Sequence, residues 1–273
     1  MLRLVAASAL LVWSALPANA ITVDLELVLA VDVSMSMDPS EVALQREGYM
    51  EALGSREVIE AILQNGEGRI AITYMEWAGQ SHSRFAVPWT LIDSPEAALH
   101  FLKRLAMSPP SRVDRTSISS ALLAAGQSFE DNGFEGYRRV IDISGDGPNN
   151  QGDALPGIRN WLVDQGIVIN GLALMYKKGS RNFGIDNLDD YYRNCVAGGH
   201  GSFVLPVRTR QGFALALKRK LLQEITNRQL PNAVETPRFL SVSMPVSTGD
   251  FDCQVGEKIW KRFIDQFGGG IAN

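Results

Sequence analysis

Between about residue 22 and residue 229, short apolar runs alternate with stretches of helical periodicity. The run at residues 27–31 is wholly apolar, which is typical of a central parallel strand covered on both faces. Strands that alternate with helices form parallel sheets. The sequence therefore predicts an α/β, doubly wound (Rossmann-like) fold with a mostly parallel six-stranded sheet and helices on both faces. The other five strands are expected at residues 69–77, 85–91, 139–144, 167–175 and 202–207.

One pair of these strands is expected to be antiparallel. A short connection joins residues 69–77 to residues 85–91, which implies an antiparallel pair. Pro88 has no amide hydrogen to donate to a further strand, so the second strand of the pair belongs at the edge of the sheet. The predicted sheet thus has one antiparallel edge strand.

Two helices carry clear start signals. Asp38 has the position of an N-cap, Pro39 that of the first helical residue, and Glu41 that of a capping box. Ser94 and Pro95 repeat the signal of a cap followed by proline. Helices are predicted near residues 40–63 with a break at Gly54, and near residues 94–105, 116–129, 154–165, 189–196 and 213–225.

The start of the chain differs in composition from the rest. Arg3 precedes an apolar stretch at residues 4–16, and residues 17–20 offer a small-residue cleavage site. We interpret residues 1–20 as a signal peptide and expect a periplasmic or secreted protein. The alternative is an uncleaved anchor, but the apolar stretch is shorter than the roughly 20 residues that a bilayer requires. After cleavage we expect no membrane span, a domain at residues 21–229 and a C-terminal tail at residues 230–273.

Charge and cysteine content narrow the functional classes. The formal net charge is −4, which does not favour nucleic acid as a partner. The one dense basic run, residues 218–220, is interpreted as a solvated helix face. Cys195 and Cys253 are the two cysteines of the chain, and export favours a disulfide between them that would hold the tail to the domain. The three histidines lack ligand spacing, so a zinc site or a Cys/His catalytic pair is not predicted.

Oxygen-bearing side chains follow the predicted strands where those strands end. Asp32, Ser34 and Ser36 come directly after the first strand, Thr116 precedes a helix, and Asp146 follows the strand at residues 139–144. In a doubly wound sheet these strand ends meet at one edge. Two carboxylates and three hydroxyls form a hard-oxygen site that suits Mg²⁺, with Mn²⁺ or Ca²⁺ as alternatives. The alternative interpretation keeps the fold without an ion, and the two serines then only cap and form turns.

This ordered set resembles the metal-ion-dependent adhesion site of von Willebrand factor type A domains. The resemblance implies that Ser34, Ser36 and Thr116 contact the metal, that Asp32 and Asp146 hold its waters, and that a carboxylate from a partner protein completes the coordination. Two departures stand out: Arg115 precedes Thr116 where the family usually has glycine, and the turn before Asp146 lacks the commoner threonine.

Residues 138–147 and 194–196 also resemble a group of exported bacterial proteins of unknown function related to that family. The resulting hypothesis is an exported, non-enzymatic, metal-dependent module for adhesion or scaffolding, which binds an unknown protein through an acidic residue.

Two other functions compete with it. One is a metal-free scaffold of the cell envelope with the same fold. The other is a magnesium-dependent phosphohydrolase of the haloacid dehalogenase kind, which needs a second acid two residues after the nucleophile. If Asp32 were the nucleophile, that position would be Ser34, which cannot serve as the acid.

Two further groups have simpler interpretations. Asp142 lies within an apolar strand, where a buried partner such as an arginine or a hydroxyl is expected rather than a catalytic role. The basic loop at residues 177–181 is interpreted as solvated, with steering of an acidic partner as the alternative.

Overall fold

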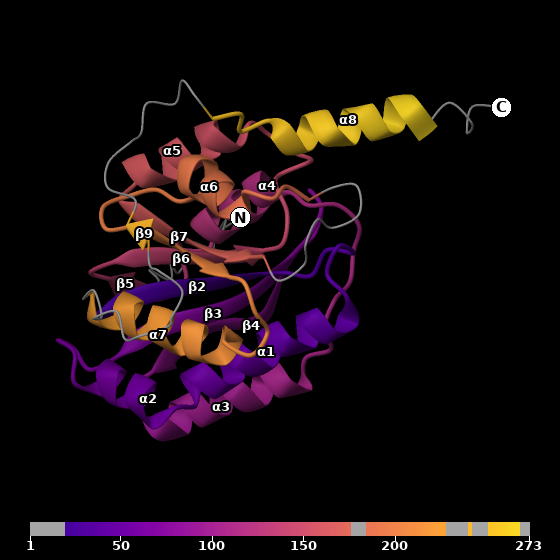
Figure 1. Ribbon diagram of the computed structural model, residues 1–273. Coiled ribbons are helices and arrows are strands. Elements are labelled where there is room, and N and C mark those ends of the chain that lie inside the picture. Colours follow the sequence, from indigo (N-terminus) through magenta and orange to yellow (C-terminus); the bar gives the residue numbers. More distant parts are fainter. Residues whose placement is uncertain (1–19, 176–183, 228–239, 242–250, 268–273) are drawn as a thin grey trace, which may run out of the picture.

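The computed structural model describes residues 20–175, 184–227, 240–241 and 251–267. One mixed sheet runs through the protein (Figure 1). Its strands are β2 (Leu25–Asp32), β3 (Ile70–Trp77), β4 (Ser83–Ile92), β6 (Arg139–Gly145), β7 (Ile167–Leu174), β8 (Phe203–Val207) and β9 (Leu240–Ser241).

The strands lie in the order β4-β3-β2-β6-β7-β8-β9. The central neighbours from β3 to β8 are parallel, whereas β4 pairs antiparallel with β3, and β9 pairs antiparallel with β8. The six predicted strands and the antiparallel edge are confirmed, and Pro88 lies in the edge strand β4. The two-residue strand β9 adds a second antiparallel edge that the sequence did not indicate. A separate parallel pair joins β1 (Ile21–Val23) to β5 (Phe134–Gly136).

Helices cover both faces of the sheet, as a doubly wound fold requires (Figure 1). One face carries α1 (Pro39–Leu53), α2 (Arg56–Leu63), α3 (Pro95–Met107) and α7 (Phe213–Thr226). The other carries α4 (Ile118–Gln127), α5 (Leu155–Asp164), α6 (Leu188–Tyr191) and the π-helix η1 (Tyr192–Val196).

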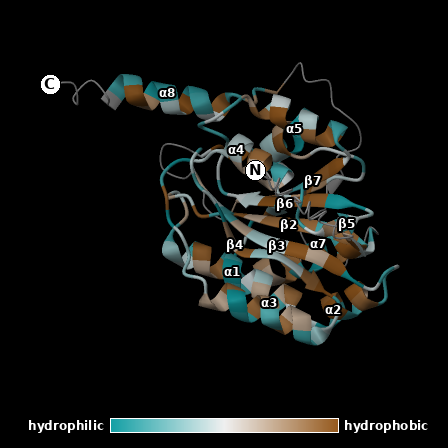
Figure 2. Ribbon diagram, turned by 180° about the vertical axis from the view of Figure 1, so that it is seen from behind, coloured by the Kyte–Doolittle hydropathy of each residue, from teal (hydrophilic) through white to brown (hydrophobic). Residues whose placement is uncertain are grey.

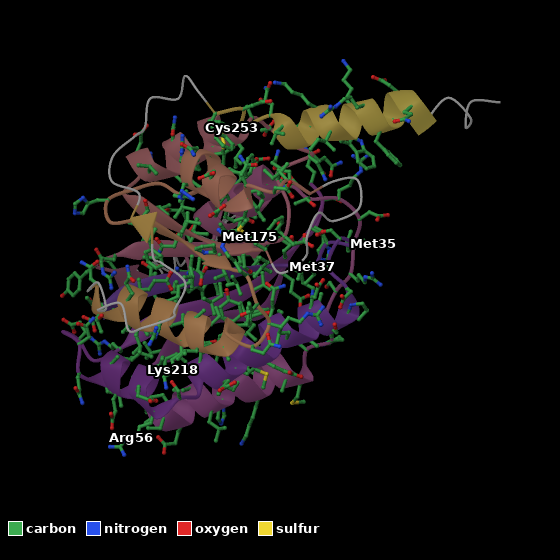
Figure 3. The ribbon with its side chains drawn as sticks, viewed as in Figure 1. Met35, Met37, Arg56, Met175, Lys218 and Cys253 are labelled. Atoms are coloured by element: carbon green, nitrogen blue, oxygen red, sulfur yellow. A yellow bond between two sulfur atoms is a disulfide. The ribbon has the colours of Figure 1, made fainter. Side chains whose placement is uncertain are left out.

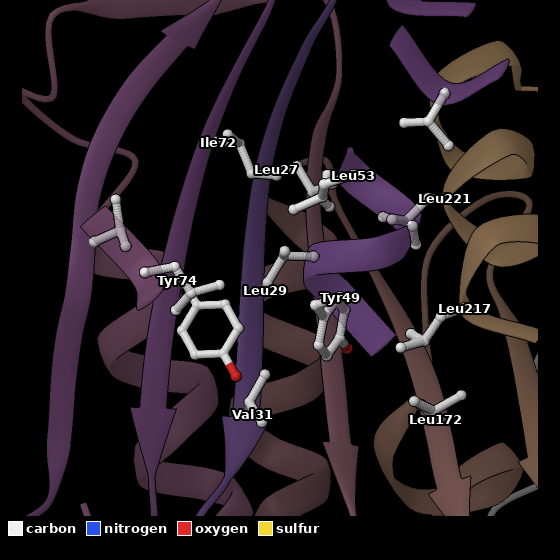
Figure 4. Packing of buried hydrophobic residues seen from close by; sticks show 14 of the residues in the cluster. Leu27, Leu29, Val31, Tyr49, Leu53, Ile72, Tyr74, Leu172, Leu217 and Leu221 are labelled. Atoms are coloured by element: carbon white, nitrogen blue, oxygen red, sulfur yellow. The ribbon is translucent and has the colours of Figure 1, made fainter. Parts of the chain in front are cut away.

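Strand β2 lies at the centre of the core, and all of its residues are buried. Successive side chains of a strand point to opposite faces. Leu27, Leu29 and Val31 therefore pack toward α1 and α7, as Figure 4 shows, while Val28 and Ala30 pack toward α4 and η1. Figure 2 shows the same arrangement: the strands are mainly hydrophobic, and the helices on either side carry both hydrophobic and hydrophilic residues. This confirms β2 as a central strand.

The turn between β2 and α1 forms as its sequence predicts. The Asp38 carboxylate accepts a hydrogen bond from the Glu41 amide at 3.0 Å, and the Glu41 carboxylate accepts one from the Asp38 amide at 2.8 Å. Pro39 occupies the first turn of the helix. This reciprocal capping fixes the point at which the chain leaves the sheet edge.

A buried ion cluster links β6 to α7. Lys220 Nζ lies 2.5 Å from Asp142 Oδ1 and 2.6 Å from Glu224 Oε1, and all three side chains are buried. The expected buried partner of Asp142 is thus a lysine, joined by the Tyr49 hydroxyl at 3.4 Å. The interpretation of residues 218–220 as a solvated face is wrong for Lys220. Because a helix turns about 100° per residue, Lys220 points inward while Lys218 reaches Glu57 at the surface.

The predicted C-terminal tail contains a helix, α8 (Val255–Phe267), which the sequence analysis did not identify. A disulfide joins Cys195 of η1 to Cys253, just before α8, with 5.5 Å between the two Cα atoms. Within the described residues, no helix combines the length and the apolar character that crossing a bilayer requires. The predicted signal peptide, apart from its last residue, and the basic loop at residues 177–181 lie outside the described residues.

Candidate metal centre

Two neighbouring strands bring the two predicted carboxylates together. β2 ends at Asp32 and β6 ends at Gly145, directly before Asp146. The strands are parallel and in register, with Val31 opposite Ser144, so the two aspartates follow at the same edge of the sheet. Asp32 is fully buried, and Asp146 is 9% exposed. Met35 and Met37 mark this edge in Figure 3.

A continuous chain of hydrogen bonds connects four of the five predicted site residues. The Ser34 amide donates to Asp32 Oδ1 at 2.7 Å, and the Ser34 and Ser36 hydroxyls share a hydrogen bond of 2.8 Å. The Ser36 hydroxyl donates to Asp146 Oδ1 at 2.6 Å. Met35, between the two serines, is 51% exposed. The alternation along this segment therefore directs the serine hydroxyls toward the carboxylates and the methionine outward.

The segment that carries Thr116 lies against the same turn. The Met35 amide donates to the Val113 carbonyl at 3.1 Å, which places residues 113–116 beside the end of β2. The Thr116 amide donates to Asn150 Oδ1 at 3.1 Å, and the Asn150 amide returns a bond of 2.9 Å to the Thr116 carbonyl. Thr116 is therefore positioned between the β2 turn and the loop after Asp146. Its backbone provides this connection, because no hydrogen bond among the described residues joins its hydroxyl to the chain of four.

The departure at Arg115 has a structural explanation. Arg115 has a φ of +74°, a left-handed conformation that favours glycine. The position directly before the threonine therefore has the backbone shape that glycine adopts most easily, although the chain has an arginine there. The backbone at residue 115 would therefore also accommodate a glycine.

No basic side chain among the described residues forms an ion pair with Asp32. Burial, followed by the charge of Asp146, raises the pKa of Asp32 from 3.8 to about 8, although hydrogen bonds from Ser34 partly offset this. Asp32 Oδ2 is buried and has no hydrogen-bond partner in the described part of the chain. A cation held near both aspartates would favour their ionised forms.

Sequence reasoning missed one side chain at this place, Tyr192. A Cβ added at Gly145 would lie 2.7 Å from the Tyr192 hydroxyl and 2.9 Å from Asp32 Oδ2, so the two oxygens flank the same glycine. The Tyr192 hydroxyl is buried and, among the described residues, makes no hydrogen bond. Tyr192 belongs to a π-helix, a feature that often occurs at functional sites, but nothing in its local sequence indicates that helix.

The residues present suit a hard divalent cation. Hydroxyl and carboxylate oxygens are the ligands that Mg²⁺ and Ca²⁺ prefer. The described residues contain no group of three or more His, Cys, Asp or Glu side chains placed to hold a metal. A site here would therefore depend on hydroxyl ligands, with carboxylates supplying the charge.

The fold is that of the von Willebrand factor type A class. A structure of proximal thread matrix protein 1 from the mussel byssus has a TM-score of 0.56 and 14% identity, over 77% of this chain and 50% of that one. A von Willebrand factor type A protein from Catenulispora acidiphila gives 0.53 and 13%, over 75% and 43%. The pilus adhesin SpaC from Lactobacillus rhamnosus GG gives 0.56 and 13% in its open conformation, over 77% and 30%.

The chain therefore spans half or less of the length of these proteins. Another structure of the mussel protein is described as having a zinc-occupied metal-ion-dependent adhesion site. No curated protein matches the chain. A family model does match, over residues 22–229, and the chain belongs to that family, DUF1194, whose description is a protein of unknown function.

Proposed function

We propose that this protein is an exported, non-enzymatic, metal-dependent protein-binding module for adhesion or scaffolding. Asp32, Ser34, Ser36, Thr116 and Asp146 would hold Mg²⁺, or alternatively Mn²⁺ or Ca²⁺. The observation that carries this proposal is the hydrogen-bonded chain from Asp32 to Asp146, in which the buried Oδ2 of Asp32 has no hydrogen-bond partner among the described residues. Such an arrangement is costly unless a cation joins it.

Each residue has a task in this proposal. Ser34, Ser36 and Thr116 present neutral oxygens to the ion, and Asp32 and Asp146 supply negative charge around it. Two carboxylates only balance the charge of a divalent ion, so the bound ion would remain attractive to a carboxylate from outside. The partner that this chemistry selects is a protein with an exposed acidic residue.

The binding role is favoured over hydrolysis by the residue at position 34. A phosphohydrolase would need a general acid two residues after Asp32. Ser34 stands there, and its hydroxyl is hydrogen-bonded to Ser36. The matrix protein and the pilus adhesin among the similar structures are consistent with a binding role. The disulfide between Cys195 and Cys253 supports export to an oxidising compartment, periplasmic or extracellular.

A thermal unfolding experiment tests the metal site. An ion that binds only the folded state stabilises it by about 2.7 kcal/mol at 100 times its Kd. For a protein of this size that raises Tm by roughly 5 to 10 °C. We expect the mature protein to show this shift with Mg²⁺ or Mn²⁺, and Asp32→Ala to lose it. The matched control is Asp164→Ala, at an exposed aspartate at the end of α5. Equal shifts in wild type and Asp32→Ala would refute the site, and no shift in wild type would favour the metal-free scaffold.

A capture experiment tests the partner. Immobilised wild-type protein is exposed to envelope extract with Mg²⁺, and bound proteins are eluted with a chelator. We expect the chelator to release proteins that Asp32→Ala does not retain. Proteins that bind both variants equally, and that resist the chelator, would show binding through another surface.

A further inference from the structure

Helix α8 lies outside residues 22–229, the part of the chain that the family model matches. It is on the same side of the sheet as α4 and α5 and extends away from the body of the protein (Figures 1 and 2). Cys253, labelled in Figure 3, stands just before it and bonds to Cys195 of η1. The helix is therefore covalently anchored next to the π-helix whose first residue, Tyr192, lies beside Asp32.

The first turn of α8 packs on the loop after Asp146. Gly256 lies so close to the Asn149 carbonyl oxygen that a Cβ at this position would overlap with it. The Asn149 side-chain amide donates to Glu257 Oε1 at 2.7 Å. Asn149 is fully buried, and its Oδ1 accepts a hydrogen bond from the Ser119 amide. One residue of the Asp146 loop thus connects α8 to the start of α4.

The second turn of α8 contacts the Thr116 segment. The Arg115 guanidinium stacks over the Trp260 ring, 3.5 Å from its centroid. Arg115 is the residue with the left-handed backbone directly before Thr116. A cation–π contact of this kind is attractive and directional. It holds the side chain of the residue in this segment that has the left-handed backbone.

A tyrosine joins these contacts to the disulfide. The Asn149 amide donates to the Tyr191 hydroxyl at 3.1 Å, and that hydroxyl donates to the Cys253 carbonyl at 3.4 Å. Both loops of the candidate metal centre are therefore attached to one unit, which consists of α8, the disulfide and the end of α6.

We propose that α8 braces the metal centre, and that Glu257 and Trp260 are positioning residues that hold the Asp146 loop and the Thr116 segment in the arrangement the ion requires. This inference rests on the proposed function and adds to it a determinant of metal affinity. Groups that are already ordered before an ion arrives bind it more tightly, because the cost of ordering them has been met in folding. Loss of either contact should therefore loosen one loop and weaken metal binding without unfolding the domain.

The experiment compares wild type with Trp260→Ala and Glu257→Ala, which removes the acceptor of the Asn149 amide, with Trp161→Ala as the control. Trp161 is a 46% exposed tryptophan of α5, so Trp161→Ala makes the same substitution in a different helix. The first measurement is hydrogen exchange without metal, in EDTA. The amides of Thr116, Ser119, Asn149 and Asn150 make the hydrogen bonds described above. They should exchange faster in the two α8 variants, and their exchange should be unchanged in the control.

The second measurement is Mn²⁺ affinity by calorimetry. Loss of a cation–π contact corresponds to roughly a 2- to 30-fold weaker Kd. We expect Trp260→Ala to fall in this range and Trp260→Phe, which retains an aromatic ring, to recover most of the affinity.

Unchanged hydrogen exchange in both α8 variants would refute the claim that α8 orders the two loops. Faster exchange with an unchanged Mn²⁺ affinity would refute the claim that this ordering strengthens metal binding. If wild type binds no Mn²⁺, the proposed function fails together with the effect on affinity. Exchange in EDTA still decides in that case whether α8 braces the loops.

Discussion

Replacing Asp32 by asparagine should stabilise the metal-free protein while removing its response to metal. Burial and the nearby Asp146 raise the pKa of Asp32 from 3.8 to about 8. Between these two values the folded protein retains a proton that the unfolded chain releases, so its stability falls as the pH rises. Each pH unit in this window costs 1.36 kcal/mol, so the loss by pH 8 is at most on the order of 6 kcal/mol. Asparagine cannot ionise and avoids this loss.

The assay is urea unfolding in EDTA at pH 5 and at pH 8, for wild type, Asp32→Asn and Asp164→Asn. Asparagine can still accept the hydrogen bond from the Ser34 amide, so the variant preserves the turn. The free energy of unfolding of Asp32→Asn should exceed that of wild type, by a margin that grows by a few kcal/mol from pH 5 to pH 8. Saturating Mg²⁺ should reverse the order, because we propose that only wild type binds it. A margin that does not grow with pH in EDTA would refute the reasoning.

Further expectations concern metal binding, the disulfide, the buried ion cluster and a close contact. Because the ion competes with the proton on Asp32, Mg²⁺ affinity measured by calorimetry should fall about tenfold per pH unit below pH 8, and a flat profile would contradict this. Cys253→Ser should lower the free energy of unfolding in urea by about 2 to 4 kcal/mol relative to oxidised wild type. If the variant remains less stable than wild type by the same amount after wild type is reduced, the loss has a cause other than the disulfide. Lys220→Met should lower the free energy of unfolding by about 3 to 5 kcal/mol, since it leaves Asp142 and Glu224 buried without their cation. An unchanged free energy of unfolding would show that the two carboxyl groups are protonated. Gly145→Ala should lower Tm and weaken Mn²⁺ binding, since its Cβ would press on Tyr192 and Asp32, whereas Gly157→Ala, with open space around it, should not.

Much of the fold could be predicted because its signals are local. Wholly apolar runs mark the buried strands, and the box formed by Asp38 and Glu41 marks the start of α1. Pro88 marks the edge strand for a reason that concerns its own backbone alone. In contrast, β1, β5 and β9 have only two or three residues each, and their pairing depends on contacts between distant segments.

The site could be predicted as far as the topology brings strand ends together. Asp32, Ser34, Ser36 and Asp146 follow adjacent parallel strands, so their meeting is a consequence of the fold class. Tyr192 could not be found this way, because a π-helix and the packing of its side chain beside Gly145 place it there.

The buried position of Lys220 and the presence of helix α8 could not be predicted either, because both depend on contacts between distant segments. Lys220 lies in a run of three basic residues, and only its direction on the helix decides that it is buried with Asp142. Helix α8 has apolar residues at helical spacing, including Val255, Ile259 and Phe263, but no neighbouring strand marks it as part of the domain. The disulfide and the contacts of Trp260 and Glu257 attach it to the domain.

The most direct test of the central claim is anomalous scattering from crystals of the protein grown with Mn²⁺. The ion's own signal locates it without reference to any assumed site. We expect a peak bounded by the hydroxyls of Ser34, Ser36 and Thr116, with Asp32 and Asp146 around it, and no such peak in Asp32→Ala crystals. A peak elsewhere, or none at this edge of the sheet in wild-type crystals saturated with Mn²⁺, would contradict the proposed metal centre.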